Sequence, residues 1–265
     1  CVIAKTINSS LLFYFTFIGG LSMIFLFSSL RRYAIYPVLG LCIYIARYML
    51  ARDMNQMRAG LAISIIISFS YLLVSKNKKE EFKYALICWL VSFIHTSMLT
   101  AIPILLFNHF FISKKTIYIG IAVSFFVSAV FSQQIISFIS QSSLIQEMAT
   151  EYVNKESSKA YAADLTNPMI YYQCIILLVY TYMEKKLAPM SKYYYVFRNG
   201  YFMSTVILIV LCQYAVLSAR VSTIFATFEI FMIPMIIVGL PKAYRFVAYL
   251  ALLAPLVVFF NYNMC

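Results

Sequence analysis

Near-continuous apolar runs, many of them long enough to cross a lipid bilayer, occupy most of this 265-residue chain and constrain its fold more than any other feature. Hydrophobic residues make up 63% of the chain and charged residues only 11%, whereas soluble domains carry about 25% charge. Inside a bilayer every backbone polar group must be satisfied internally, as it is in a helix. Since a spanning helix needs about 20 apolar residues, we predict an all-α, polytopic membrane bundle of about 9–10 segments. It would form a single domain over residues 1–265.

Short charged or polar stretches separate the apolar runs and set the expected membrane segments. These segments are Leu11–Leu30, Tyr33–Leu50, Met57–Val74, Tyr84–Ile112, Thr116–Ser132, Met169–Met183, Tyr201–Ala219, Val221–Leu240 and Phe246–Tyr262. Residues 133–168 begin with apolar residues that alternate with Gln and Ser, which predicts an amphipathic helix in the membrane interface and then a loop on the outer side. Because residue 1 is Cys rather than Met, we expect a truncated N-terminus.

The run Tyr84–Ile112 is too long for one perpendicular span. Its 29 residues would form a helix about 43 Å long, against about 30 Å of hydrocarbon. Two interpretations stay open, namely a tight helical hairpin that turns near His95–Thr96–Ser97 or one long tilted helix. The hairpin is favoured because it places the lysines beyond both ends of the run on the same side of the membrane.

With the hairpin, the charges follow the positive-inside rule. The cytoplasmic side carries Arg31, Arg32, Lys76, Lys78, Lys79, Lys83, Lys114, Lys115, Lys185, Lys186, Lys192, Arg198, Lys242 and Arg245. The outer side keeps half as many, namely Lys5, Arg47, Arg52, Arg58, Lys155, Lys159 and Arg220. The net charge of +12 is therefore attributed to cytoplasmic loops at the bilayer surface, and nucleic acid is not an expected partner. His95 also falls on the outer side.

Three arginines cluster where one expected span ends and the next begins: Arg47, Arg52 and Arg58. An arginine at mid-bilayer costs roughly 2.5–3.5 kcal/mol, and such residues usually face a bundle interior or a wet cavity. Guanidinium groups bind phosphate oxygens two at a time, and a helix N-terminus adds backbone N–H donors. Asp53 and Gln56 in the same turn can orient the arginines. The cluster predicts a phosphate site, unless the arginines only reach the headgroups or pair with Asp53.

Three other polar residues interrupt apolar runs: His95, Arg220 and Glu229. His95 is either a hydrogen-bonded core histidine or a donor or general acid–base at the hairpin tip, with Thr96 and Ser97 as candidate partners. Arg220 is either the boundary between two spans or a cation that faces a ligand. For Glu229 we expect a structural pair with another helix, with a functional carboxylate as the alternative.

Motifs for nucleotide, metal or redox chemistry are missing from the sequence. It contains no Walker loop, GxSxG, HExxH or CxxC, and the six cysteines are interpreted as small apolar residues. The expected outer side has few carboxylates, so metal-dependent sugar transfer is not favoured and we predict neither a metal nor a cofactor. One of these carboxylates, Asp164, is a candidate for binding an extended polar substrate.

Three segments resemble, in the family order, motifs of the EpsG-like members of the Wzy polysaccharide polymerases. RDMNQMRAGLA at residues 52–62 is similar to their RNQIRQGIA motif, and FIHTS at residues 93–97 is similar to FHxSA. SARVSTIF at residues 218–225, followed by EIFMIP, is similar to their GRLxxYF…IP region, with Val221 in place of the usual Leu. The resemblance covers roughly residues 40–240.

The resemblance implies a glycosyltransferase-C-like fold in a multi-pass protein of the bacterial inner membrane. It implies transfer of a growing glycan from undecaprenyl diphosphate to a lipid-linked repeat unit on the periplasmic face. A chain-length regulator and a flippase are then candidate partners. Together with the cation cluster, it predicts catalytic roles for His95, Arg58 and Arg220 and substrate-binding roles for Arg47, Arg52, Asp53, Gln56 and Asp164.

Other activities stay open at this point. An O-antigen ligase-like transferase uses the same chemistry with a different acceptor. A flippase or transporter of lipid-linked oligosaccharide should show internal repeats or unusual charges on both sides of the membrane, whereas here these charges gather on one side. A membrane-bound acyltransferase would need a histidine beside Asp, Asn or Arg, and His95 has only Thr and Ser beside it.

Overall fold

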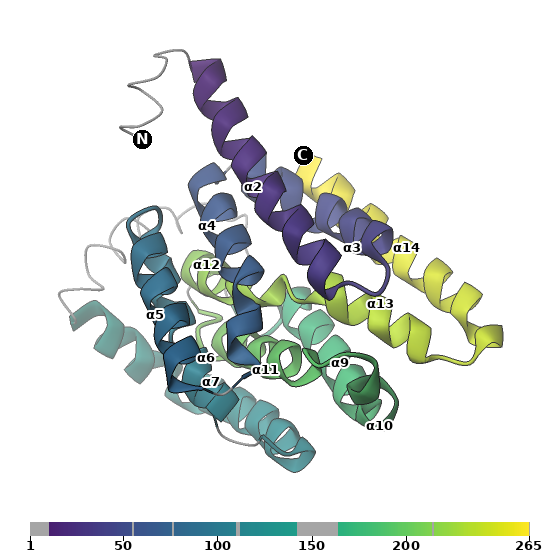
Figure 1. Ribbon diagram of the computed structural model, residues 1–265. Coiled ribbons are helices and arrows are strands. Elements are labelled where there is room, and N and C mark those ends of the chain that lie inside the picture. Colours follow the sequence, from purple (N-terminus) through teal and green to yellow (C-terminus); the bar gives the residue numbers. More distant parts are fainter. Residues whose placement is uncertain are drawn as a thin grey trace.

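In a computed structural model the chain is helical throughout the part that the structure describes (Figure 1). The described residues are 11–54, 56–75, 77–109, 112–141, 164–213 and 215–264. No strand occurs within these ranges. The all-α fold predicted from the apolar runs is therefore confirmed for the described residues.

Except between residues 141 and 168, short connections join the described helices. In chain order these are α2 (Leu11–Tyr33), α3 (Pro37–Tyr44), the π-helix η1 (Ile45–Met54), α4 (Met57–Ser68), the 3₁₀-helix η2 (Ser70–Leu73), α5 (Lys78–Ser92), the 3₁₀-helix η3 (Thr96–Ala101), α6 (Ile104–His109), α7 (Lys114–Gln141), α9 (Pro168–Tyr182), α10 (Glu184–Leu187), the 3₁₀-helix η4 (Ala188–Met190), α11 (Tyr194–Val210), α12 (Ala215–Ala226), α13 (Glu229–Gly239) and α14 (Lys242–Met264). Asn77 and Asn167 cap the starts of α5 and α9, each accepting a hydrogen bond from the backbone N–H two residues later.

Two helices among the described residues are long and apolar enough to cross a membrane, namely Phe13–Tyr33 and Lys114–Phe131. A third candidate is the pair Leu217–Ala226 and Glu229–Gly239, which is bent by 50°. Shorter apolar helices occupy Pro37–Met49, Met57–Ser68, Thr96–Leu106 and Pro168–Tyr182. Turns and π- and 3₁₀-segments thus divide the apolar runs more often than the sequence pattern indicates. A membrane protein is supported, and the count of about 9–10 segments stays a prediction.

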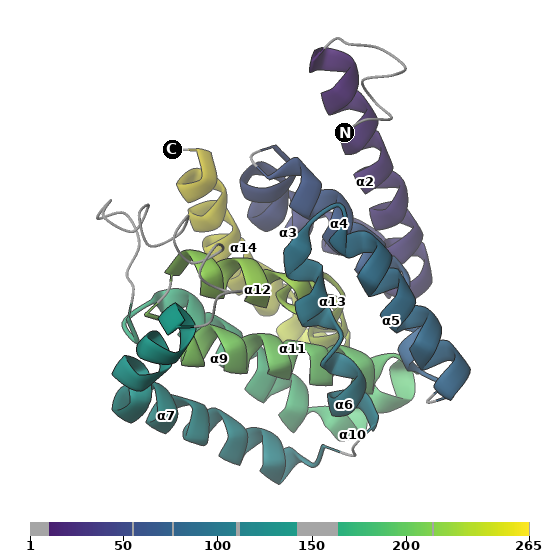
Figure 2. The same cartoon turned by 90° about the vertical axis from the view of Figure 1, so that its left-hand side faces the viewer.

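The overlong run contains a chain reversal. Helix α5 ends at Ser92, the backbone at His95 is extended, and η3 then begins at Thr96. The returning η3 packs against α5, and Figure 2 shows the chain doubling back from α5 to α6. This is the predicted hairpin, and it excludes the single long tilted helix.

Two predicted boundaries are wrong, and a third stays a prediction. Helix α7 continues to Gln141, while its candidate membrane span ends at Phe131, beside the predicted end at Ser132. Residues 142–163 of the predicted outer segment lie outside the described residues, and the interfacial position of residues 133–168 stays a prediction. Helix α11 begins at Tyr194, before the expected start at Tyr201, and the added turns bury Tyr194 and Phe197. Helix α12 passes through Arg220 without a break, as arginine is a good helix former. Arg220 is therefore not a boundary between two spans.

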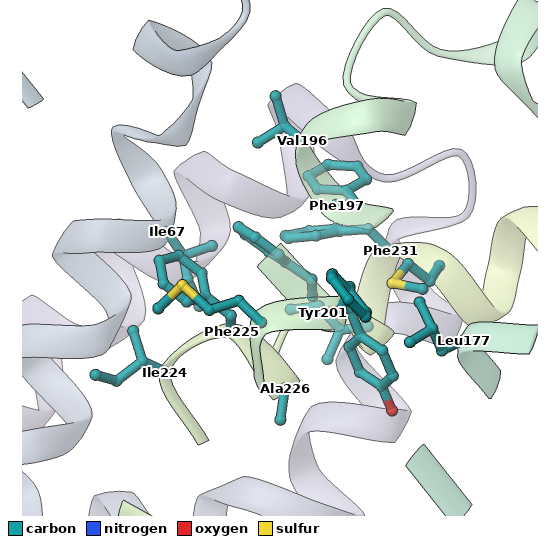
Figure 3. Close-up of a cluster of buried hydrophobic side chains, with 14 of the residues drawn as sticks. Ile67, Leu177, Val196, Phe197, Tyr201, Ile224, Phe225, Ala226 and Phe231 are labelled. Carbon is teal, nitrogen blue, oxygen red and sulfur yellow. The ribbon is translucent and has the colours of Figure 1, made fainter. Parts of the chain in front are cut away.

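The core surrounds α11, which contacts α6, α7, α9, α12 and α13. Figure 3 shows its aromatic centre, where the ring of Phe197 stacks on Phe231 with centroids 5.1 Å apart. The Ser204 hydroxyl donates to the carbonyl of Ser222 at 2.7 Å, which ties α11 to α12. Interhelical hydrogen bonds and small residues hold helices together where lipid leaves little hydrophobic driving force. These contacts fix α12, which carries Arg220.

Replacing Gly40 by alanine is expected to destabilise the protein. A Cβ at Gly40 would lie 2.8 Å from the backbone oxygen of Ile230, and a backbone atom cannot move aside as a side chain can. Overpacking of this kind costs about 1–3 kcal/mol. Gly20→Ala is the matched control, because nothing lies within 4 Å of its Cβ position. Thermal unfolding in detergent measures both; equal stability of Gly40→Ala and wild type would show that α3 and α13 are not closely packed.

Candidate functional site

Three of the predicted site residues come together at the hairpin tip. His95 precedes η3, Arg58 lies in the first turn of α4, and Arg220 lies within α12. Helix α12 packs against η3, and α4 packs against α5. His95 lies outside the candidate membrane spans, and its pKa is lowered by partial burial, then by the positive charges of Arg220 and Arg58. The charges of both arginines thus act on the imidazole.

The hairpin turn fixes the orientation of the His95 ring. Its backbone is extended, with φ −151° and ψ 114°, and its Nδ1 lies 2.9 Å from Ser97 Oγ. The backbone N–H of Ser97 also points at Nδ1, at 3.4 Å. A nitrogen that accepts from this N–H carries no proton itself, so the neutral ring holds its proton on Nε2. His95 can therefore donate a hydrogen bond from Nε2, and Ser97 is the partner that the sequence indicated.

The two arginines differ in exposure. The Arg58 side chain is exposed and Arg220 is half-buried. Arg58 stands at the N-terminal end of α4, where unpaired backbone N–H groups and the helix dipole favour an anion. The site thus combines two guanidinium groups, one neutral imidazole donor and a helix N-terminus, an arrangement suited to binding a polyanion.

Arg47 is engaged in a different place. Its Nη1 forms a buried ion pair with Glu229, and Nη2 lies 2.9 Å from the sulfur of Met169. The hydroxyl of Tyr201 donates to the same carboxylate at 3.2 Å, and the Arg47 guanidinium lies 4.6 Å from the centre of the Tyr172 ring. Of the two interpretations of Glu229, the structural pair with another helix is the one observed. The role predicted for Arg47 in binding substrate stays a prediction.

The remaining predicted residues have no observed role in this site. Arg52 and Asp53 belong to η1, but their side chains lie outside the described part of the chain. Gln56 is exposed directly before α4. Asp164 is exposed and accepts a hydrogen bond from the backbone N–H of Thr166 at 2.7 Å, and its bonds to Thr166 lower the pKa of the carboxyl. Asp164 thus closes a local turn before α9.

A second charged cluster was not predicted from the sequence. The buried Arg198 donates to Glu184 at 2.8 Å and to the carbonyl of Ile112. Lys114 lies 4.0 Å from the same carboxylate. These contacts join α7, α10 and α11. The signal in the sequence was Arg198, a lone arginine within an aromatic stretch. From the sequence it was assigned only to the charges of the cytoplasmic side.

Among the described residues, no three His, Cys, Asp or Glu side chains come together as a metal site. The chain matches no curated protein and no solved structure. The model of one protein family, the EpsG family, matches residues 1–265, the whole chain.

Proposed function

Because the chain belongs to the EpsG family, a polysaccharide polymerase-like family, we propose that it polymerises a bacterial surface polysaccharide. The family and the apolar helices support a membrane protein of polysaccharide biosynthesis. In this proposal it is a glycosyltransferase of the inner membrane with a glycosyltransferase-C-like bundle. It moves a glycan chain from undecaprenyl diphosphate to a lipid-linked repeat unit on the periplasmic face. A flippase would supply the repeat unit, and a chain-length regulator would limit the product.

The proposal is supported by the packing of α12 against η3 and by the effect of the Arg58 and Arg220 charges on His95. In the transfer, a hydroxyl oxygen of the acceptor sugar bonds to the anomeric carbon while the carbon–oxygen bond to the diphosphate breaks. The electron pair leaves with the diphosphate, and the hydroxyl proton passes to solvent. Negative charge therefore grows on the leaving group, where two preorganised guanidinium groups stabilise it. No metal is needed for this role of the arginines.

His95 acts in the proposal as a neutral hydrogen-bond donor. With Nδ1 occupied by Ser97, the Nε2–H group is free to face an oxygen of the diphosphate or of the sugar. Arg58 and Arg220 supply the positive charge. Partial burial, and then these two charges, lower the pKa of His95 and favour the neutral imidazole. The site thereby combines two charged donors with one neutral donor of fixed orientation.

Reconstitution tests the proposed function. Proteoliposomes that contain only this protein and a purified undecaprenyl-diphosphate-linked repeat unit should yield a ladder of glycan lengths on a gel. Each added unit should release one undecaprenyl diphosphate. Movement of the lipid-linked unit across the bilayer without any ladder would instead identify a flippase.

Substitutions at His95 should show which of its two ring nitrogens is needed for activity. The amide nitrogen of glutamine reaches about as far as Nε2, whereas that of asparagine reaches only about as far as Nδ1. We therefore expect His95→Gln to retain more polymer per molecule of protein than His95→Asn or His95→Ala, with His95→Ala reduced about 10²-fold. Polymer output and protein level are measured on the same membranes. If all three variants make as much polymer per molecule of protein as wild type, His95 is not part of the site.

The pH dependence checks the same assignment. Because the pKa of His95 is lowered, the neutral ring persists down to about pH 6.5, the ordinary histidine value. Activity is expected to stay level from pH 8 to this point and to fall only in more acidic buffer, as the ring gains its proton. An activity that rises as the pH falls through 6.5 would show that the charged ring is the active form.

A further inference from the structure

We infer that the buried Arg47–Glu229 ion pair is a positioning element that fixes the placement of Arg58 relative to Arg220. Arg47 lies on η1, the segment that leads into α4 and Arg58. Glu229 is the first residue of α13, the helix that follows α12 and Arg220. One salt bridge thus joins the two stretches of chain that carry the arginines of the site. Its effect on turnover rests on the proposed function, whereas its effect on geometry does not.

The surroundings of the pair suit such a role. Arg47 is 8% exposed and Glu229 is fully buried, so solvent and salt screen their attraction little. Tyr201 of α11 donates to the carboxylate, and Tyr172 of α9 stacks under the guanidinium. Four elements, η1, α9, α11 and α13, therefore meet at one charged contact. Ionisable residues in such apolar surroundings are costly, and specificity of packing is one reason for them to be retained.

The bend between α12 and α13 is the second observation. Taken together the two helices are long and apolar enough for a single span, yet they are bent by 50°. Sharp bends usually arise at proline, at glycine or serine, or where the helical hydrogen bonds are interrupted. Here the break consists of Thr227 and Phe228, and Pro234 lies further along α13. Glu229 directly follows the break, so its bond to Arg47 holds the bend that sets the direction of α12.

Glu229 does not touch substrate in this account. Its side chain is fully buried, and Oε2 of the carboxylate accepts from both Arg47 and Tyr201. Any influence on the reaction must therefore pass through the helices that it anchors. The pair positions Arg58 and Arg220 and is not itself catalytic.

A distance measurement tests the inference without any substrate. Spin labels on unnatural amino acids at Gln56 and Ala219, two exposed positions beside Arg58 and Arg220, report the separation of α4 and α12 by pulsed electron resonance in the full-length protein. The six cysteines stay in place. Glu229→Gln and Arg47→Gln are expected to shift and broaden the distance distribution. Because activity is not measured, the result stands whether or not the protein polymerises glycan.

Two further variants control the measurement. Glu80→Gln breaks the exposed Lys83–Glu80 pair within α5, which contributes little to stability, and it should leave the distribution unchanged. The double variant Arg47→Met/Glu229→Met leaves no unpaired charge, so folding is preserved, but its thioether side chains form no directed link. It should therefore broaden the distribution as well. A distribution identical to wild type in both Glu229→Gln and the double variant would overturn the inference.

Discussion

Replacement of Arg58 or of Arg220 by alanine is expected to abolish long glycan chains while leaving normal amounts of protein in the membrane. Each guanidinium stabilises charge that develops only as the glycosidic bond breaks, and loss of one such preorganised donor costs about 10²–10³ in rate. A polymerase adds many units in succession, so a loss of this size at every step leaves only short products. Polymer length on gels, normalised to protein in the same membranes, measures the effect.

The lysine variants distinguish bidentate binding of phosphate by a guanidinium from attraction by a positive charge alone. Lysine is a point charge and cannot make the two parallel hydrogen bonds of a guanidinium, so Arg58→Lys and Arg220→Lys should restore little. Arg31→Ala is the matched control, because Arg31 is an exposed arginine at the far end of α2. Wild-type ladders from both lysine variants would argue against recognition of phosphate by a guanidinium fork.

Glu229→Ala is expected to be the most destabilising of the substitutions considered. It leaves the Arg47 guanidinium buried without its counter-charge. Removing one partner of a buried ion pair costs about 3–5 kcal/mol, a large fraction of the roughly 5–15 kcal/mol that hold a typical native protein together. The expected outcome is a much reduced yield and a lower unfolding temperature in detergent.

The exposed pair Lys83–Glu80 provides the comparison. These side chains also form a short contact, 2.7 Å, but Lys83 is 60% exposed. Exposed ion pairs contribute only about 0–1 kcal/mol, so Glu80→Ala should unfold within a few degrees of wild type. The double variant Arg47→Met/Glu229→Met should recover much of the stability lost in Glu229→Ala. Equal stability of Glu229→Ala and Glu80→Ala would mean that Arg47 finds another partner or reaches water.

The sequence was sufficient for the helical fold and for the hairpin. Apolar length identified the helices, and the charges beyond both ends of Tyr84–Ile112 favoured a reversal close to where α5 ends. The π-helix η1 and the bend before Glu229 could not be predicted. Both depend on packing between helices that are distant in sequence, and the local residues alone contain no proline or glycine at the bend.

The candidate site was also predictable only in part, because some of its contacts join residues that are distant in sequence. His95, Arg58 and Arg220 each stand out locally as a polar residue beside apolar runs, and the hairpin brings them to one place. Arg47 stood out in the same way, but its partner Glu229 is 182 residues away. Nothing in one sequence pairs these two residues, so Arg47 was grouped with its neighbours in the chain instead of with its contact in space.

Equilibrium binding of undecaprenyl diphosphate tests most directly whether the hairpin-tip cations form the substrate site. Native mass spectrometry of the protein in lipid nanodiscs compares undecaprenyl diphosphate with undecaprenol, which has the same tail and no charge. We predict that wild type prefers the diphosphate by at least about 100-fold, or roughly 2.8 kcal/mol, and that Arg58→Ala/Arg220→Ala removes this preference. Equal affinity of wild type for both lipids, or an unchanged preference in the double variant, would contradict the account.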